Sequence, residues 1–252
     1  MSAAIPRRIK SAERTLALFE LFSREQRPFT VGRIAAALGI PQPSVSMLLH
    51  NLEALGYLEY DQAARTYAPS IRVALLGSWI DRKFALAGAI GQTLGELQRA
   101  TGLTAFIGIQ NGSSAQYVLA QNAGSPDRLE VVSGGHRSLT VSAVGRALLS
   151  LKPDAEVRSW VRRCNAEAGE PRFRVNETAY LALIEDVRAR GWAETAGEVT
   201  PGLGAIAMTF VSPMGTAPLA VGAGGPMAQL ATRREAVLAA LRRFKAAFAE
   251  SP

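Results

Sequence analysis

Few side chains in this sequence have the chemistry of a catalytic or metal site. The 252-residue chain contains two histidines and one cysteine, too few for the ligand cluster of a zinc site. His136 follows a Gly-Gly turn and has Ser133, Ser138 and Ser142 nearby in the sequence, so a Ser–His pair stays open. No G-x-S-x-G or S-x-x-K motif accompanies it. We therefore expect no catalytic residue, no metal ion and no cofactor.

Two glycine-rich segments could form a phosphate-binding turn. The segment Gly222–Pro226 follows an apolar stretch, but Met227 stands where the third glycine of G-x-G-x-x-G is needed. The sequence ends at Pro252, before a further strand of a βαβ unit could form. Gly202-Leu203-Gly204 follows a proline instead of a strand. We expect no nucleotide site at either segment.

A different chemistry is indicated by the segment from Pro41 to Gly56. Its apolar residues recur at helical spacing and predict a buried stripe, formed by Val45, Leu48, Leu49, Leu52 and Leu55. The residues on the opposite face are small or polar, and such side chains can approach base edges or phosphates in a major groove. These predicted DNA-binding residues are Gln42, Ser44, Ser46, Met47, His50 and Asn51.

Cations beside this helix are the predicted phosphate contacts. Arg33 precedes the helix, and Arg65 and Thr66 follow it in a predicted hairpin. The helix itself has no Lys or Arg between Pro41 and Leu58, so it lacks the arginine that commonly pairs with guanine. An alternative is that the same elements form a docking module for another protein; steep salt dependence of binding would favour DNA.

The elements around this helix predict a winged helix-turn-helix domain over residues 1–70. A first helix is expected from an N-cap at Ser11, with Leu16, Phe19 and Phe22 on its apolar face. Thr30 should cap a short second helix that Gly39 ends. Strands at 57–60 and 65–67 form the hairpin. This order places the third helix for insertion into the major groove.

The remaining sequence predicts a linker helix over 71–84 and an α+β domain over 85–252. A helix is expected at 86–101, and Asn111-Gly112 divides two strands of a hairpin, 103–110 and 115–120. Weaker strands at 129–133 and 138–141 follow. The other predicted helices are 142–151, 154–167, 177–190 and one from Met227, and the other strands are 205–211 and 218–223.

Charge and cysteine content fit this assignment. The net charge is +7, and residues 1–83 hold 11 Lys and Arg against 7 Asp and Glu, which allows a polyanionic partner. A single cysteine, Cys164, excludes an intrachain disulfide and suits a reducing compartment. No apolar run reaches the length of a membrane span. We expect a cytoplasmic protein with no membrane partner.

The sequence resembles IclR-type transcriptional regulators along nearly its whole length, from about residue 11 to 245. The resemblance is carried by several segments and by no single motif: Thr30–Ala35, Leu38–Pro41, Leu48–Leu58, Gly135–Leu149, Val187–Trp192, Glu198–Ala207 and Leu219–Pro226. It implies a regulator that binds operator DNA and a small-molecule effector. It also implies a GAF-like effector domain, with an antiparallel sheet flanked by helices, and a homodimer or tetramer.

The resemblance also implies the position of the effector site. Relatives that bind carboxylates line the pocket with an acidic residue, a cysteine and serines, and the matching positions here are Thr195, Ala205, Gly222 and Gly224. Together with Ser142 and Ala143 these are the predicted effector-binding residues. Because most polar groups are lost, we expect a roomier, more apolar pocket. A buried carboxylate needs several donors, so an aromatic or otherwise less polar effector than a small 2-oxo acid is expected.

Two alternatives from other classes stay open at this point. The chain could be a small-molecule sensor that acts through protein contacts, with the N-terminal domain as its docking module. It could also be an enzyme built on the C-terminal domain, for which His136 would have to be a catalytic base. Loss of turnover on His136→Ala would identify the second alternative.

Overall fold

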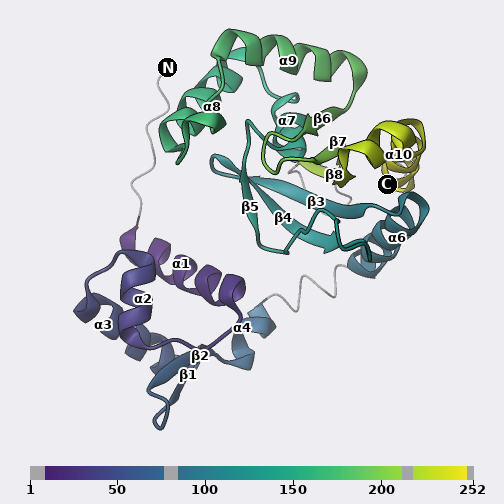
Figure 1. Ribbon diagram of the computed structural model, residues 1–252. Coiled ribbons are helices and arrows are strands. Elements are labelled where there is room, and N and C mark those ends of the chain that lie inside the picture. The colour runs from purple at the N-terminus through teal and green to yellow at the C-terminus, as the bar shows by residue number, and fades with distance from the viewer. Residues whose placement is uncertain (1–8, 77–84, 212–217, 249–252) are drawn as a thin grey trace. The chain divides into compact units, whose positions relative to one another are not determined.

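The computed structural model describes residues 9–76, 85–211 and 218–248. The chain divides into two compact units, Met1–Lys83 and Phe84–Pro252, and Figure 1 shows each of them. The described part of the first contains four helices and a two-stranded sheet, and the second contains a six-stranded sheet with helices. The fold is therefore α+β, as the sequence predicts.

Three helices open the first unit: α1 (Lys10–Glu25), α2 (Val31–Leu38) and α3 (Gln42–Ala54). The Thr30 hydroxyl accepts a hydrogen bond from the Arg33 N–H at 3.4 Å and caps α2, and Gly39 ends it in the left-handed region at φ 64°. Both predictions are confirmed. The predicted cap at Ser11 is wrong. The helix starts at Lys10, and the Ile9 carbonyl accepts the first helical hydrogen bond, from Glu13.

The hairpin consists of β1 (Leu58–Asp61) and β2 (Thr66–Pro69), paired antiparallel. A bridge between Phe29 and Tyr67 joins it to the segment before α2. The core of this unit lies between α1, α2, α3 and the hairpin, and it includes Leu18, Leu21, Phe22, Ile34, Val45, Leu49, Leu52, Leu58 and Tyr67. Two residues predicted to be buried are exposed instead, Leu16 by 65% and Leu55 by 51%.

The two exposed leucines lie where the helical pattern drifts from the buried face. On α1 the buried residues are Leu18, Leu21 and Phe22. Leu16 lies outside this buried stripe. Leu55 is the C-cap of α3, outside its last regular turn. Beyond the hairpin, α4 (Ile71–Leu76) is the described part of the predicted linker helix; residues 77–84 lie outside the described residues.

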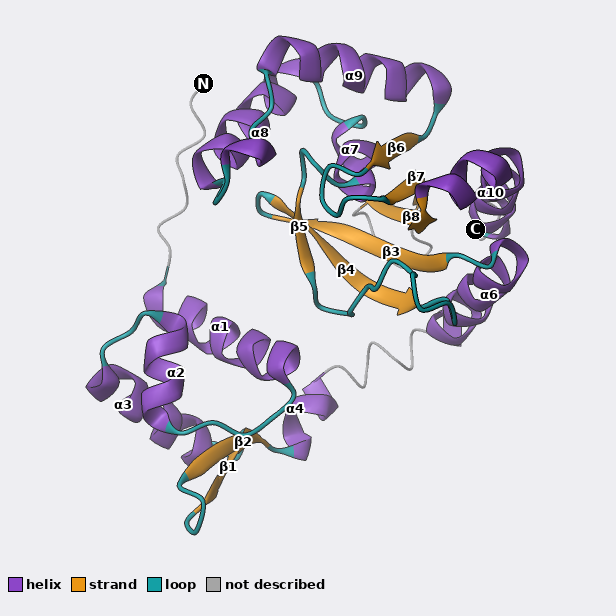
Figure 2. Cartoon of the chain, in the orientation of Figure 1, coloured by secondary structure: helices purple, strands orange, loops and turns teal. Residues whose placement is uncertain are grey.

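The second unit is built on one antiparallel sheet with the strand order β5-β4-β3-β8-β7-β6 (Figure 2). Neighbouring strands pair antiparallel throughout. The strands are β3 (Thr104–Asn111), β4 (Ser114–Gln121), β5 (His136–Ser138), β6 (Ala193–Ala196), β7 (Leu203–Val211) and β8 (Pro218–Pro226).

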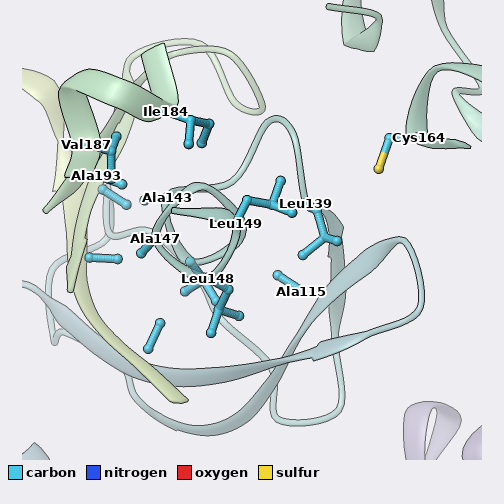
Figure 3. Close-up of a cluster of buried hydrophobic side chains, with 14 of the residues drawn as sticks. Ala115, Leu139, Ala143, Ala147, Leu148, Leu149, Cys164, Ile184, Val187 and Ala193 are labelled. Atoms are coloured by element: carbon cyan, nitrogen blue, oxygen red, sulfur yellow. The ribbon is translucent and has the colours of Figure 1, made fainter. Parts of the chain in front are cut away.

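Helices cover both faces of this sheet. On one face, α6 (Ala85–Thr101) and α10 (Met227–Ala247) pack over Ala105 and Ile107 of β3. On the other face α7 (Ala143–Leu149) lies over Phe106, with α8 (Asp154–Glu167) and α9 (Glu177–Arg190) beyond it. Alternate residues of β3 therefore belong to two different cores, as strand geometry requires. Figure 3 shows the second of these cores, with Ala147, Leu148 and Leu149 of α7 at its centre.

Two strand predictions in this unit differ from the structure. Residues 129–133 form a loop, because the Asn122 side chain binds both the N–H and the carbonyl of Val131 and so replaces a strand partner. The strand predicted at 138–141 lies slightly earlier, as β5. Strand β6 was not predicted from its Ala-Glu-Thr-Ala sequence, and it forms by pairing with β7. A short 3₁₀ turn, Pro171–Phe173, links α8 to α9.

Candidate functional site

Helix α3 presents a mostly polar face to solvent. Gln42, Met47, His50 and Asn51 are exposed, Met47 by 74%. Ser44 and Ser46 are half-buried. The stripe of Val45, Leu49 and Leu52 holds the opposite side of the helix in the core. The predicted two-faced helix is present, with the two serines set further back than the amide and imidazole side chains.

His50 has a fixed orientation on this face. Its Nδ1 lies 2.8 Å from the Ser46 carbonyl oxygen, and since a carbonyl only accepts, Nδ1 carries the hydrogen. The imidazole also meets the Tyr67 ring edge-on, with centroids 6.4 Å apart. Nε2 is therefore the ring atom left to contact a partner, and it is an acceptor when the imidazole is neutral.

Two cations flank the exposed face of α3. Arg33 on α2 and Arg65 in the hairpin turn are both exposed, and neither forms an ion pair with any described residue. Thr66 begins β2 and is half-buried. Arg65 has a φ of 53°, a left-handed conformation that costs a non-glycine residue energy. An unpaired cation held in a strained turn is suited to contact an anionic partner.

Four of the six residues predicted to bind an effector meet at one small cavity in the second unit. Ser142, Ala143, Thr195 and Ala205 line it. The lining residues that sequence analysis did not predict include Phe106, Tyr117, Leu129, Arg137 and Leu203. We call this cavity the Phe106 pocket; its volume is about 40 Å³. Strand alternation could have identified Phe106 and Tyr117, but the face they occupy depends on the sheet order.

Two of the hydroxyls that line the Phe106 pocket, those of Ser142 and Thr195, are already partly engaged. The Ser142 Oγ accepts a hydrogen bond from the Gly145 N–H at 3.1 Å, which leaves its O–H free to donate. The Thr195 hydroxyl lies 3.5 Å from the Ala205 carbonyl. Burial raises the pKa of Tyr117, and the nearby Arg137 cation opposes this shift. The pocket therefore offers an apolar wall, hydroxyl groups, one cation and the carboxylate of Glu198.

Gly222 and Gly224 do not line the pocket. A Cβ on Gly222 would lie 2.9 Å from Cζ of Phe106, and a Cβ on Gly224 would collide with the Leu129 side chain. The space that the missing side chains leave is thus filled by Phe106 and Leu129. The pocket has a volume of about 40 Å³ in this structure, well below the roughly 150 Å³ of a cavity that holds benzene, and the expectation of a pocket roomier than in carboxylate-binding relatives stays a prediction.

A loop between β6 and β7 closes one side of the Phe106 pocket. Glu198, Val199 and Thr200 line the pocket, and Gly197 and Gly202 at the two ends of the loop have positive φ. Glu198 forms an ion pair with Arg146 at 2.9 Å. Arg146 is only 6% exposed, and it also donates to the carbonyls of Thr140 and Glu194. One ion pair to a buried arginine therefore fastens this loop to α7.

A larger cavity of about 360 Å³ lies beside the Phe106 pocket and shares Arg137 and Val199 with it. We call it the Arg137 cavity. Strand β5 lines it with His136, Arg137 and Ser138. The β3–β4 turn contributes Ser113, and the C-terminal part of α8 contributes Cys164 and Glu167.

The residues considered for catalysis are not arranged as a catalytic site. Within the described ranges no hydrogen bond joins His136 to a serine, and the Ser142 Oγ caps α7. Burial raises the pKa of the Cys164 thiol, which donates to the Ser113 carbonyl and is thereby a weak nucleophile. Gly222–Pro226 is paired with β3 and β7 along the sheet instead of forming a phosphate-binding turn.

The described residues contain no group of three or more His, Cys, Asp or Glu side chains able to hold a metal ion. Among the same residues, no helix has the length and apolarity needed to cross a membrane.

Family models match both units of the chain. The model described as the IclR helix-turn-helix domain matches residues 11–62. The model described as the C-terminal domain of the bacterial transcriptional regulator IclR matches residues 82–248.

Similar proteins extend over most of the chain. It is 28% identical over 208 residues to the Pca regulon regulatory protein of Pseudomonas putida, covering 81% of this chain and 70% of that protein. It is 27% identical over 245 residues to the HTH-type transcriptional regulator BhcR of Paracoccus denitrificans, covering 94% and 86%. A third relative, the glycerol operon regulatory protein of Streptomyces griseus, is 28% identical over 227 residues, 89% of this chain and 87% of that one.

Solved structures share the fold. The IclR transcriptional regulator of Alicyclobacillus acidocaldarius superposes with a TM-score of 0.80 at 22% identity, covering 96% of this chain and 98% of that chain. HmgR of Pseudomonas aeruginosa superposes with a TM-score of 0.68 at 22% identity, covering 95% and 99%.

Proposed function

Since this chain belongs to the IclR family of bacterial transcriptional regulators, we propose that α3 and the β1–β2 hairpin form its contact with operator DNA. The chain is a DNA-binding regulator controlled by a small-molecule effector. The observation that supports this contact surface is the exposed face of α3, flanked by the unpaired cations Arg33 and Arg65. Such a face presents hydrogen-bonding groups to base edges and cations to phosphates.

The chemistry of this face predicts how the operator is read. Gln42 and Asn51 can each contact adenine through two hydrogen bonds, and His50 offers Nε2 as an acceptor. Phosphate contacts would come from Arg33 and Arg65. Because α3 has no Lys or Arg, the direct arginine–guanine contact would be absent from the helix, and recognition would rely on amide and imidazole groups.

Substitution of these residues tests the proposed surface. An operator is first selected from random duplexes with the wild-type protein. Asn51→Ala should then weaken operator binding by about 1–3 kcal/mol and relax sequence preference at one position. Arg33→Ala should weaken all duplexes and lower the salt slope by about one unit. Arg172→Ala, an exposed cation in the other unit, is the control. Unchanged operator binding by both Asn51→Ala and Arg33→Ala would overturn the assignment.

We propose that the effector occupies the Phe106 pocket. Apolar groups form most of its wall, and Glu198, its one carboxylate, is already paired with Arg146. The effector should therefore be aromatic or otherwise less polar than a small 2-oxo acid. The other polar groups in the lining are Tyr117, Arg137, Ser142, Thr195 and Thr200. A ring could enter only if Phe106 or Leu129 moves, since the volume is about 40 Å³. The names of two relatives, which refer to the Pca regulon and the glycerol operon, support a catabolic metabolite.

A thermal-shift screen tests the effector class. Aromatic metabolites should stabilise the full chain more than pyruvate or glyoxylate does. Phe106→Ala should enlarge the pocket and strengthen the response to rings, whereas Thr195→Val should weaken the response to ligands that accept or donate a hydrogen bond there. Stabilisation by pyruvate or glyoxylate alone would refute the proposed class. A response that neither variant alters would refute the location.

Effector binding is proposed to act on DNA affinity through the linker. In this scheme residues 1–70 bind DNA, 71–84 form the lever and 85–252 bind the effector. The effector must bind the DNA-competent and DNA-incompetent arrangements with different affinity, or it shifts nothing. Fluorescence anisotropy with labelled operator at saturating effector measures this coupling. Unchanged operator affinity would defeat it.

We also propose a homodimer, with tetramers as a further assembly, that places two α3 helices on half-sites about one helical turn apart. Sedimentation equilibrium and footprinting on the selected operator test this. A monomer that protects a single half-site would contradict it. The protein is proposed to act in the cytoplasm, where the DNA is, and without catalysing a reaction; fractionation of cells that express the tagged chain tests the location.

A further inference from the structure

We propose that the Arg137 cavity is a second ligand site, which takes a small carboxylate with an apolar body. This inference goes beyond the Phe106 pocket and does not depend on it. The Arg137 cavity has a volume of about 360 Å³, compared with about 40 Å³ for the Phe106 pocket. Ligand pockets in proteins usually start near 300 Å³, so the larger cavity accepts a small molecule without rearrangement.

The anion-binding group of this cavity is Arg137. Its guanidinium donates to the neighbouring His136 carbonyl at 2.9 Å, and no carboxylate among the described residues forms an ion pair with it. Arg137 is exposed, whereas Arg146 and Arg188, which are more buried, are engaged by Glu198 and Asp154. Arg137 therefore retains donors for a bidentate contact with a carboxylate.

The charge around the cavity favours an anion. The one carboxylate in its lining is Glu167. Arg163 compensates the Glu167 charge at 2.9 Å, and the Ser113 hydroxyl donates to the same carboxylate. This leaves the positive charge of Arg137 unmatched, with the imidazole of His136 and the hydroxyl of Ser138 beside it. An acidic ligand is thus preferred over a basic one.

An apolar body is indicated by the remaining wall. Val141 is buried, and Phe173 and Val199 are half-buried side chains that line the same space. They come from three segments: the turn after β5, the 3₁₀ turn and the β6–β7 loop. Cys164, which lines the cavity from α8, belongs to the same hydrophobic cluster as the α7 side chains (Figure 3). The cavity therefore borders this core.

The test uses the full chain and benzoate as the probe, with benzamide as its uncharged match and acetate as a carboxylate without a ring. Isothermal titration should detect benzoate at millimolar concentration and give at least tenfold weaker binding for benzamide and acetate. Arg137→Gln should weaken benzoate binding by about 10- to 100-fold, the loss expected for charge-assisted hydrogen bonds. Ala168→Phe should abolish it by filling the cavity that Ala168 lines.

Two control variants show in which cavity benzoate binds. Ala166→Phe adds the same ring to an exposed position of α8 outside the cavity lining and should leave benzoate binding unchanged. Thr195→Val alters only the Phe106 pocket, so it can weaken benzoate binding at that pocket but should leave unchanged the binding that Ala168→Phe removes. Benzoate binding that survives Ala168→Phe but is lost in Thr195→Val overturns the second site while supporting the effector pocket. Equal binding of benzoate and benzamide, or no benzoate binding at millimolar concentration, also overturns it.

Discussion

Replacement of Arg65 by glycine should raise protein stability and lower DNA affinity. Arg65 lies at the hairpin turn with a φ of 53°, and no described residue forms an ion pair with it. A left-handed conformation costs a residue with a Cβ about 1–2 kcal/mol. Glycine avoids this cost but loses about 0.4–1 kcal/mol through the greater freedom of its unfolded chain. Arg65→Gly should therefore be more stable than Arg65→Ala by about 0.5–1 kcal/mol.

The effect on DNA follows from the lost charge. One phosphate contact contributes about 0.9 to the slope of log K against log salt, which corresponds to about five- to tenfold weaker binding near 0.1 M salt. Arg65→Gly and Arg65→Ala should show the same loss. Arg65→Lys keeps both the charge and the strained backbone, so it should match the wild type in both measurements.

Urea denaturation of the full chain and fluorescence anisotropy on a mixed-sequence duplex at several salt concentrations measure the two quantities. The comparison of glycine with alanine isolates the Cβ, and the comparison of alanine with lysine isolates the charge. If Arg65→Ala keeps the wild-type salt slope, Arg65 does not contact phosphate. If Arg65→Gly is less stable than Arg65→Ala, the turn is not strained as its φ indicates.

Three further substitutions test the second unit. Glu198→Gln removes the charge that pairs with the buried Arg146 and should cost about 1.5–3 kcal/mol in urea denaturation; Glu194→Gln, whose partner Arg234 is 46% exposed, should cost less than about 1 kcal/mol. Gly145→Ala places a Cβ 2.6 Å from the Leu139 carbonyl carbon and should destabilise the protein by at least about 1–3 kcal/mol, whereas Gly169→Ala meets nothing within 4 Å and should be neutral. Arg162 and Arg158 lower the pKa of Glu177 from 4.5 to about 2. Its contribution is therefore present above about pH 4.5 and is lost as the pH falls toward 2, so the stabilities of wild type and Glu177→Gln should converge in acid; a constant difference would contradict the assignment.

Local signals in the sequence were enough to predict most elements. Thr30 and Gly39 determine the ends of α2 through their own hydrogen bonding and backbone conformation, which is information that the neighbouring residues contain. The hairpin between β3 and β4 could likewise be predicted from the two residues of its own turn, Asn111-Gly112. The boundaries of α8 and α9 follow from a proline and an asparagine at their N-caps and a glycine after α9.

What could not be predicted depends on contacts between distant segments. The loop at 129–133 has a strand-like sequence, but the Asn122 side chain takes the hydrogen bonds of Val131. The size of the Phe106 pocket depends on the pairing of Phe106 with Gly222 across β3 and β8. No pattern in the sequence predicts this register between β3 and β8. The lining residues of the pocket were thus predicted in part, and its volume was not.

The Phe106–Gly222 pair also limits how this pocket can change during evolution. A serine introduced at Gly222 would collide with the aromatic ring, and its Cβ would also lie 2.9 Å from the Ile206 carbonyl oxygen, so a polar side chain cannot be introduced there by that substitution alone. A smaller side chain at Phe106 must come first, and by itself it leaves a void. Under the proposed effector location, a change of ligand preference through Gly222 therefore needs two substitutions, the first of which destabilises the protein. The double variant Phe106→Ala/Gly222→Ser should be more stable than the sum of the two single effects predicts.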